Sequence, residues 1–163
     1  MKTKLIFLLA IIWGGGYQLH ADSPLTSTDI SKSYEDVPIV LLASQAEGKL
    51  TEELMDYLVN PENPIDIRVA LINALSWGHE GIENAAIFLA YLEGMEMFTD
   101  YNDFSRKAPW DLLICMAYLD ALDDYFNVSS AMSLAKRARS KNRNSYTVRI
   151  ICALIEAQIA MHR

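Results

Sequence analysis

The sequence predicts an all-α protein of about seven helices, arranged as stacked antiparallel hairpins in a helical bundle or a short α-solenoid. Apolar residues recur at helical spacing through most of residues 34–163. Glycine-, asparagine- and proline-containing breaks separate these apolar runs at short intervals. No segment shows the strict two-residue alternation of a half-buried strand. These observations favour helix-on-helix packing in one domain, residues 34–163.

The first three helices are bounded by local stop and start signals. The first helix is expected over about residues 34–47, ending at Gly48. A short second helix begins after Thr51 as N-cap and ends before the break at residues 60–64. Pro64 suits the start of a third helix, residues 65–77. This third helix is apolar on nearly all sides, which predicts a central position in the fold.

Four further helices complete the chain. A one-sided fourth helix is expected over about 83–93, followed by an irregular stretch, residues 94–108. Pro109 opens an apolar fifth helix that runs to about Tyr125. Ser129 or Ser130 caps a basic sixth helix to about residue 140, and Ser145 caps a seventh over about 146–162. Residues 22–33, rich in Ser, Thr and Asp, show no periodicity and are expected to form a flexible lead-in.

The first 21 residues have the pattern of a secretory signal peptide. Lys2 and Lys4 precede nine consecutive apolar residues, and three glycines then interrupt the run. Nine residues span about 14 Å as a helix, too short for a bilayer core of about 30 Å. Cleavage is expected after Ala21. We therefore expect a protein that works outside the cytoplasm, with no membrane span once the signal is removed.

Charge is unevenly distributed after the signal. Residues 22–126 hold 20 acidic and 5 basic side chains, whereas residues 127–163 hold 1 acidic and 7 basic ones. The resulting net charge of −9 argues against a general nucleic-acid binder. The asymmetry is compatible with a partner-binding surface and equally with two helix faces that are simply solvated.

Cys115 and Cys152 are the two cysteines, and both lie in apolar helical runs. An oxidising compartment permits a disulfide between them, which would stabilise the fold by about 3–4 kcal/mol. Two buried free thiols are the alternative, because the sequence does not establish how closely the two Cα atoms approach.

Few residues suit catalysis or metal binding. His79 is the strongest candidate, since it lies in a turn with Glu80 and Glu83. The glycines at 78 and 81 argue against the regular helix that a metallopeptidase motif needs. The acids at 120, 123 and 124 and the basic run 136–143 fit solvated helix ends and faces as well as contact surfaces. We therefore expect no enzymatic activity, no cofactor and no metal site.

Binding is the remaining function class, and two segments are candidates. Residues 94–108 are long for a helix connection and place large apolar side chains among charges. Aromatic and methionine side chains with a polar rim are typical of interface hot spots. Packing of these aromatics onto the core is the alternative. With the 78–83 turn added, the predicted partner-binding residues are Phe98, Asp100, Tyr101, Asp103, Phe104, His79 and Glu80.

Two resemblances refine this expectation. Residues 64–75 resemble the inner helix of a HEAT repeat, and residues 148–155 follow the pattern more loosely. The run 70–78, with Gly81, Asn84-Ala85 and residues 88–92, resembles the core of small exported helical proteins of Gram-negative bacteria. Among these, the chain is similar to the immunity proteins of type VI secretion amidase effectors. The resemblance covers about 25 of the 142 residues that follow the signal.

The resemblance implies a periplasmic, often dimeric protein that inserts a loop into the active-site cleft of a peptidoglycan amidase. We accordingly expect an exported inhibitor with a protein partner, an amidase effector, and a homodimer as a further option. A helical-repeat scaffold in envelope assembly is the alternative function.

Overall fold

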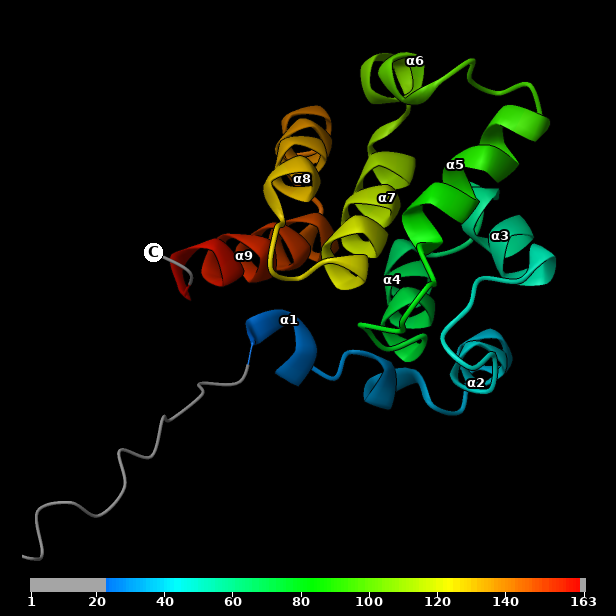
Figure 1. Ribbon diagram of the computed structural model, residues 1–163, viewed down its shortest axis with the longest axis vertical. Helices are drawn as coiled ribbons and strands as arrows, with labels where there is room; N and C mark the ends of the chain where they lie inside the picture. Colours follow the sequence, from blue (N-terminus) through cyan, green and yellow to red (C-terminus); the bar gives the residue numbers. More distant parts are fainter. Residues whose placement is uncertain (1–22, 162–163) are drawn as a thin grey trace, which may run out of the picture.

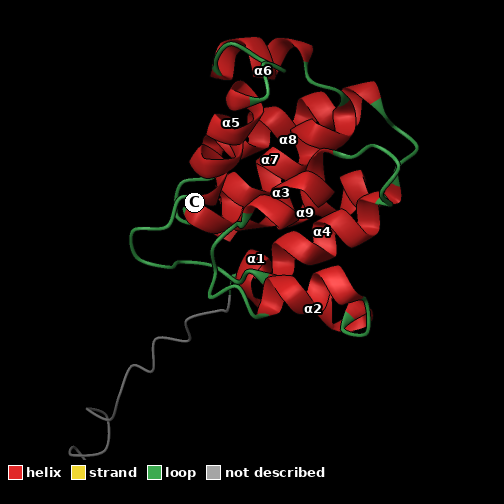
Figure 2. Cartoon of the chain, turned by 90° about the vertical axis from the view of Figure 1, so that its right-hand side faces the viewer, coloured by secondary structure: helices red, strands yellow, loops and turns green. Residues whose placement is uncertain are grey.

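The computed structural model describes residues 23–161, and in that range it contains helices joined by turns, with no β-strand (Figure 2). The elements are α1 (Pro24–Ser27), the 3-10 helix η1 (Ser31–Tyr34), α2 (Pro38–Ser44), α3 (Glu52–Val59), α4 (Ile65–Ala74), α5 (Asn84–Gly94), α6 (Tyr101–Lys107), α7 (Trp110–Asp123), α8 (Ser129–Lys141) and α9 (Tyr146–Met161). The all-α prediction is confirmed. The described range holds nine α-helices rather than about seven, because α1 and α6 form in segments expected to be irregular.

Two sequence predictions concern export and membrane crossing. The predicted signal peptide, residues 1–21, lies outside the described residues. Within residues 23–161, no helix combines the length and the apolar content that crossing a bilayer requires.

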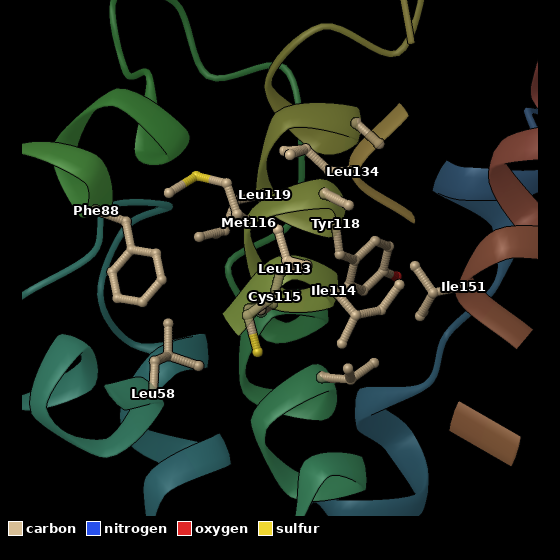
Figure 3. Close-up of a cluster of buried hydrophobic side chains, with 14 of the residues drawn as sticks. Leu58, Phe88, Leu113, Ile114, Cys115, Met116, Tyr118, Leu119, Leu134 and Ile151 are labelled. Carbon is tan, nitrogen blue, oxygen red and sulfur yellow. The ribbon is translucent and has the colours of Figure 1, made fainter. Parts of the chain in front are cut away.

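Helix α7 forms the centre of the molecule. Every residue from 111 to 119 is buried, as expected for a helix whose apolar side chains point in all directions. Figure 1 shows α4 and α5 on one side of α7 and α8 and α9 on the other. In the core, Phe88 and Leu58 face α7 from one side and Ile151 from the other, near Tyr118 (Figure 3).

The two HEAT-like segments occupy different environments. In α4, residues 68–73 are all buried, as the apolar pattern of this helix predicts, although the centre of the molecule is α7. The Arg68 guanidinium lies inside the core and contacts the Asp111 carboxylate of α7 at 2.8 Å. In α9, the corresponding Arg149 is exposed and lies over the ring of Tyr146, with 4.4 Å to the ring centroid.

Residues 23–34 differ from the flexible lead-in that composition suggested. Leu25 of α1 is completely buried, and α1 packs against α9 and α7. The side chain of Asn73 in α4 holds the turn between α1 and η1. It accepts a hydrogen bond from the Ser31 N–H (2.9 Å) and donates one to the Thr28 carbonyl (3.1 Å). The same amide donates to the Tyr118 hydroxyl at 2.9 Å. One buried amide therefore joins the N-terminal segment to both α4 and α7.

Candidate partner-binding surfaces

The segment 94–108 is more ordered than the sequence suggested. It contains a turn after α5 and then the helix α6, which leads directly into α7. The two phenylalanines pack inward: Phe104 is completely buried, Phe98 nearly so, and their rings meet edge to face at 5.1 Å between centroids. Phe98 and Phe104 therefore follow the alternative prediction, packing onto the core, and present no side chain to a partner in this conformation.

Three other side chains of this segment face outward. Met95, Met97 and Tyr101 are 47%, 41% and 41% exposed. We call these three residues the methionine–tyrosine rim. Tyr101 belongs to the predicted binding set, which contains neither methionine. The periodic pattern that assigns helix faces does not extend through a turn, so the sequence did not separate the inward aromatics from the outward methionines.

Hydrogen bonds hold the rim at both ends. At the end of α5, the Met97 N–H donates to the Leu92 carbonyl at 3.1 Å, and Glu96 takes a left-handed backbone with φ 58°. This is the geometry of a Schellman helix end. At the start of α6, the Asp100 carboxylate accepts from the Asp103 N–H at 2.8 Å. Asp100 is therefore the N-cap of α6, a role the sequence did not assign to it.

Asp103 also has a structural role. Its side chain is nearly buried and contacts the Lys107 ammonium at 2.6 Å, one turn along α6. The Lys107 hydrogen bond lowers the pKa of the Asp103 carboxyl. Asp103 also accepts from the Thr99 N–H at 3.4 Å, which ties α6 back to the turn. Its oxygens thus stabilise the segment that displays the rim.

The 78–83 turn packs against a second turn, residues 47–50. The Nε2–H of His79 donates to the Leu75 carbonyl at 3.1 Å, and the imidazole ring lies over Gly48. A Cβ at position 48 would lie 2.2 Å from this ring, so the ring would have to move, and the φ of +80° at Gly48 favours glycine there. Glu80 is exposed and remains available for contact.

The structure separates the two predicted binding segments. The 78–83 turn precedes α5 and the rim follows it (Figure 1), so the 11 residues of α5 lie between them. At 1.5 Å per residue this is about 16 Å along the helix. His79 and Glu80 therefore do not form one compact site with Asp100 and Tyr101, and the two turns are separate candidate surfaces.

No protein-family model, no curated protein and no solved structure matches the chain.

The acidic end of α7 has an internal role that the sequence did not reveal. The Asp123 carboxylate accepts from the Ala85 N–H at 2.7 Å and so caps α5. The N-cap residue of α5 itself, Glu83, makes no such hydrogen bond through its side chain. Nearby, Asp120 accepts a hydrogen bond from the Ser130 hydroxyl at the start of α8. These two carboxylates join helix ends, because the fold brings residues 85 and 123 together.

Asp123 makes the stability of the protein pH-dependent. Burial raises the pKa of its carboxyl to about 6, above an unfolded value of about 3.9. Because the folded pKa is the higher one, the stabilisation is present below about pH 4 and is lost as pH rises through about 6. The Asp123→Asn variant should therefore gain stability relative to wild type between pH 4 and pH 7.5. Urea unfolding of both proteins at the two pH values measures this gain, and a constant difference in unfolding free energy would contradict it.

The two cysteines are free thiols, and both are buried. Cys115 lies beside Arg68 of α4, and burial raises the pKa of its thiol to about 11. The Cys152 thiol instead points to the Ala135 carbonyl of α8, with Sγ and O 3.3 Å apart. The disulfide that the sequence permitted is not formed, because the two thiols face different neighbours.

The basic run is only partly engaged within the chain. Arg139 pairs with Glu156 of α9 at 3.2 Å, and Lys141 donates to the Ala108 carbonyl at 2.6 Å. Lys136 and Arg137 lie on the exposed side of α8, next to each other and alongside exposed serines. The described contacts therefore fit the solvated-face alternative for α8.

Proposed function

We propose that this chain is an exported binding protein that inhibits a peptidoglycan amidase by occupying its active-site cleft. The observation that carries the proposal is the methionine–tyrosine rim. Met95 and Met97 are exposed in the turn after α5 and Tyr101 at the start of α6, and this segment is hydrogen-bonded at both ends. A surface already held in its binding conformation loses less entropy on association.

The chemistry of the rim supports a protein partner. Methionine and tyrosine are enriched at interface centres, and methionine adapts to irregular surfaces. The carboxylates around the rim, Glu93, Glu96 and Asp100, are exposed and supply a polar border. We infer that this exposed apolar segment, bordered by carboxylates, is the part of the chain that enters the partner's cleft.

The amidase partner follows from the resemblance of residues 70–92 to amidase immunity proteins, together with the export signal. A HEAT-like stacking of the helical hairpins and a homodimer belong to the same proposal. The exposed Tyr146 and Ile150 on the first turns of α9 supply an apolar surface for a second copy.

Two experiments test the proposed activity. The chain, expressed with its own export signal and purified from the periplasm, is mixed with the amidase encoded by a neighbouring gene, and peptidoglycan cleavage is measured. We expect stoichiometric inhibition. We also expect cells that lack this gene to be killed by sibling cells. Survival equal to wild type would contradict the immunity function, and capture of envelope-assembly proteins instead would favour the scaffold alternative.

The rim is tested by the double variant Met97→Ala/Tyr101→Ala. Loss of two hot-spot side chains should weaken partner affinity by about 2 kcal/mol or more, about 30-fold, without unfolding the protein. Titration calorimetry measures the affinity. The control is Met161→Ala, the same residue type at the same 41% exposure on α9. If the double variant binds as tightly as the control while His79→Ala weakens binding, the 78–83 turn is the inserted segment.

A further inference from the structure

A groove runs beside the N-terminal segment, on the opposite side of α4 from the rim's supporting helix α5. It lies where the α1–η1 segment passes α4 to reach α2, near the lower edge of Figure 1. Two adjoining hollows of about 440 and 340 Å³ form it, and both are lined by Asp29, Ser31, Ser44 and Ala74. Trp77 lines one end, and Leu41 and Glu35 line the other.

The polar atoms of this groove are set up to accept hydrogen bonds. Three of its hydroxyl groups already donate within the chain: Thr28 to the Pro24 carbonyl (2.7 Å), Ser44 to the Leu41 carbonyl (2.7 Å) and Ser31 to the Asp29 carboxylate (2.9 Å). Because their protons are already donated, these hydroxyl oxygens can only accept hydrogen bonds from a ligand. A ligand that fits such a lining supplies N–H donors.

The charge of the groove favours a cation. Asp29 and Glu35 are exposed carboxylates, and neither has a salt bridge among the described residues. One oxygen of Asp29, Oδ1, accepts from the Ser31 hydroxyl and from the Lys32 N–H at 3.0 Å, so the loop holds this carboxylate in place. Lys32 is the one cation in the lining of the two hollows.

The apolar part of the lining narrows the choice of cation. Trp77 is 40% exposed and follows Ser76, whose φ of 69° ends α4 in a left-handed turn. Indole faces bind planar guanidinium groups by stacking and by cation–π attraction. Guanidinium also carries five N–H donors, which match a lining of acceptors better than the three donors of an ammonium.

We propose that this groove binds a guanidinium group, carried by an arginine side chain of the partner protein. Asp29, which lines both hollows, accepts its N–H groups, and Trp77 covers its planar face, while Glu35 at the other end of the groove adds to the negative charge. Which protein supplies the arginine rests on the proposed function. The preference of the groove for guanidinium can be tested without any partner protein.

The test is a nuclear magnetic resonance titration of the full-length, exported protein with N-acetyl-arginine methylamide. We expect amide shifts at residues 28–35, 41–44 and 76–77 and weak affinity, in the millimolar range typical of a single side chain. The matched probe is the citrulline analogue, which has nearly the same shape but no charge. Equal affinity for both probes, or shifts confined to other residues, would overturn the proposal.

Variants assign the contacts. Asp29→Asn keeps the acceptor for Ser31 and Lys32 but removes the charge, and should weaken arginine binding about 3- to 10-fold. Lys32→Gln should strengthen it about 2-fold by removing a competing cation. Glu62→Gln, an exposed acid in the turn before α4, is the control and should leave affinity unchanged. If Asp29→Asn behaves like this control, the groove does not bind guanidinium in the way proposed.

Measuring amidase inhibition beside binding of the arginine probe distinguishes the two proposals. If the arginine probe binds but no amidase is inhibited, the groove stands and the proposed function fails. If the amidase is inhibited and Asp29→Asn changes the affinity for neither the arginine probe nor the amidase, the proposed function stands and the groove assignment fails.

Discussion

The Asp111→Ala variant should lose about 3–5 kcal/mol of folding free energy, the usual cost of removing one partner of a buried ion pair. Arg68 is 1% exposed, and its single hydrogen-bonded nitrogen, Nη1, contacts Asp111 at 2.8 Å. The other two guanidinium nitrogens, Nε and Nη2, have no hydrogen-bond partner among the described residues. Without Asp111, the buried positive charge of Arg68 would therefore lose the one carboxylate with which it pairs among the described residues.

Two further variants separate charge from packing in this pair. Asp111→Asn keeps an acceptor for Nη1 and should cost less than Asp111→Ala. The double variant Arg68→Met/Asp111→Leu removes both charges and should recover most of the loss, because well-packed apolar replacements of buried ion pairs are often neutral or stabilising. Urea unfolding gives the free energies, and labelling of the buried Cys115 thiol reports opening of the same region. A double variant less stable than Asp111→Ala would contradict this account.

Phe104→Ala is the second substitution with a large expected effect, about 3–5 kcal/mol of stability. Phe104 is completely buried and meets Phe98 edge to face, so its removal leaves a cavity and an unsupported ring. The pair belongs to the same segment, residues 94–108, as the methionine–tyrosine rim. Partner affinity should therefore fall as well, although Phe104 itself makes no contact with solvent.

The readout must distinguish local loosening from global unfolding. Thermal unfolding and hydrogen exchange of residues 95–107 are measured on Phe104→Ala and on Phe104→Leu, which refills part of the cavity. We expect faster exchange in this segment for the alanine variant and partial recovery for leucine. Exchange as slow as in wild type, together with unchanged stability, would show that the aromatic pair does not support the rim.

Several parts of the fold were predictable because their signals are local. Thr51 and Ser145 cap α3 and α9 as expected, with their side chains accepting from the N–H groups three residues ahead. Pro64 and Pro109 immediately precede α4 and α7. Such signals act within one helical turn, and apolar periodicity within one helix, so they can be read without knowing the neighbours.

The short elements escaped prediction for the opposite reason. The 3-10 helix η1 and the helices α1 and α6 have only four to seven residues each. Helices of this length are not stable alone and depend on tertiary contacts. For α1 and η1 these contacts are the buried Leu25 and the hydrogen bonds of Asn73, which lies more than 40 residues away.

The residue sequence alone therefore established the all-α class, the main helices and the apolar character of α4, α7 and α9. Only the tertiary structure decided which side chains of the 94–108 segment face solvent, that Asp123 caps α5, and that Arg68 pairs with Asp111. In the last two cases the partners are remote in the chain, 38 residues apart for Ala85 and Asp123 and 43 for Arg68 and Asp111. Contacts at such separation leave no periodic signal, because they depend on how the helices pack around α7.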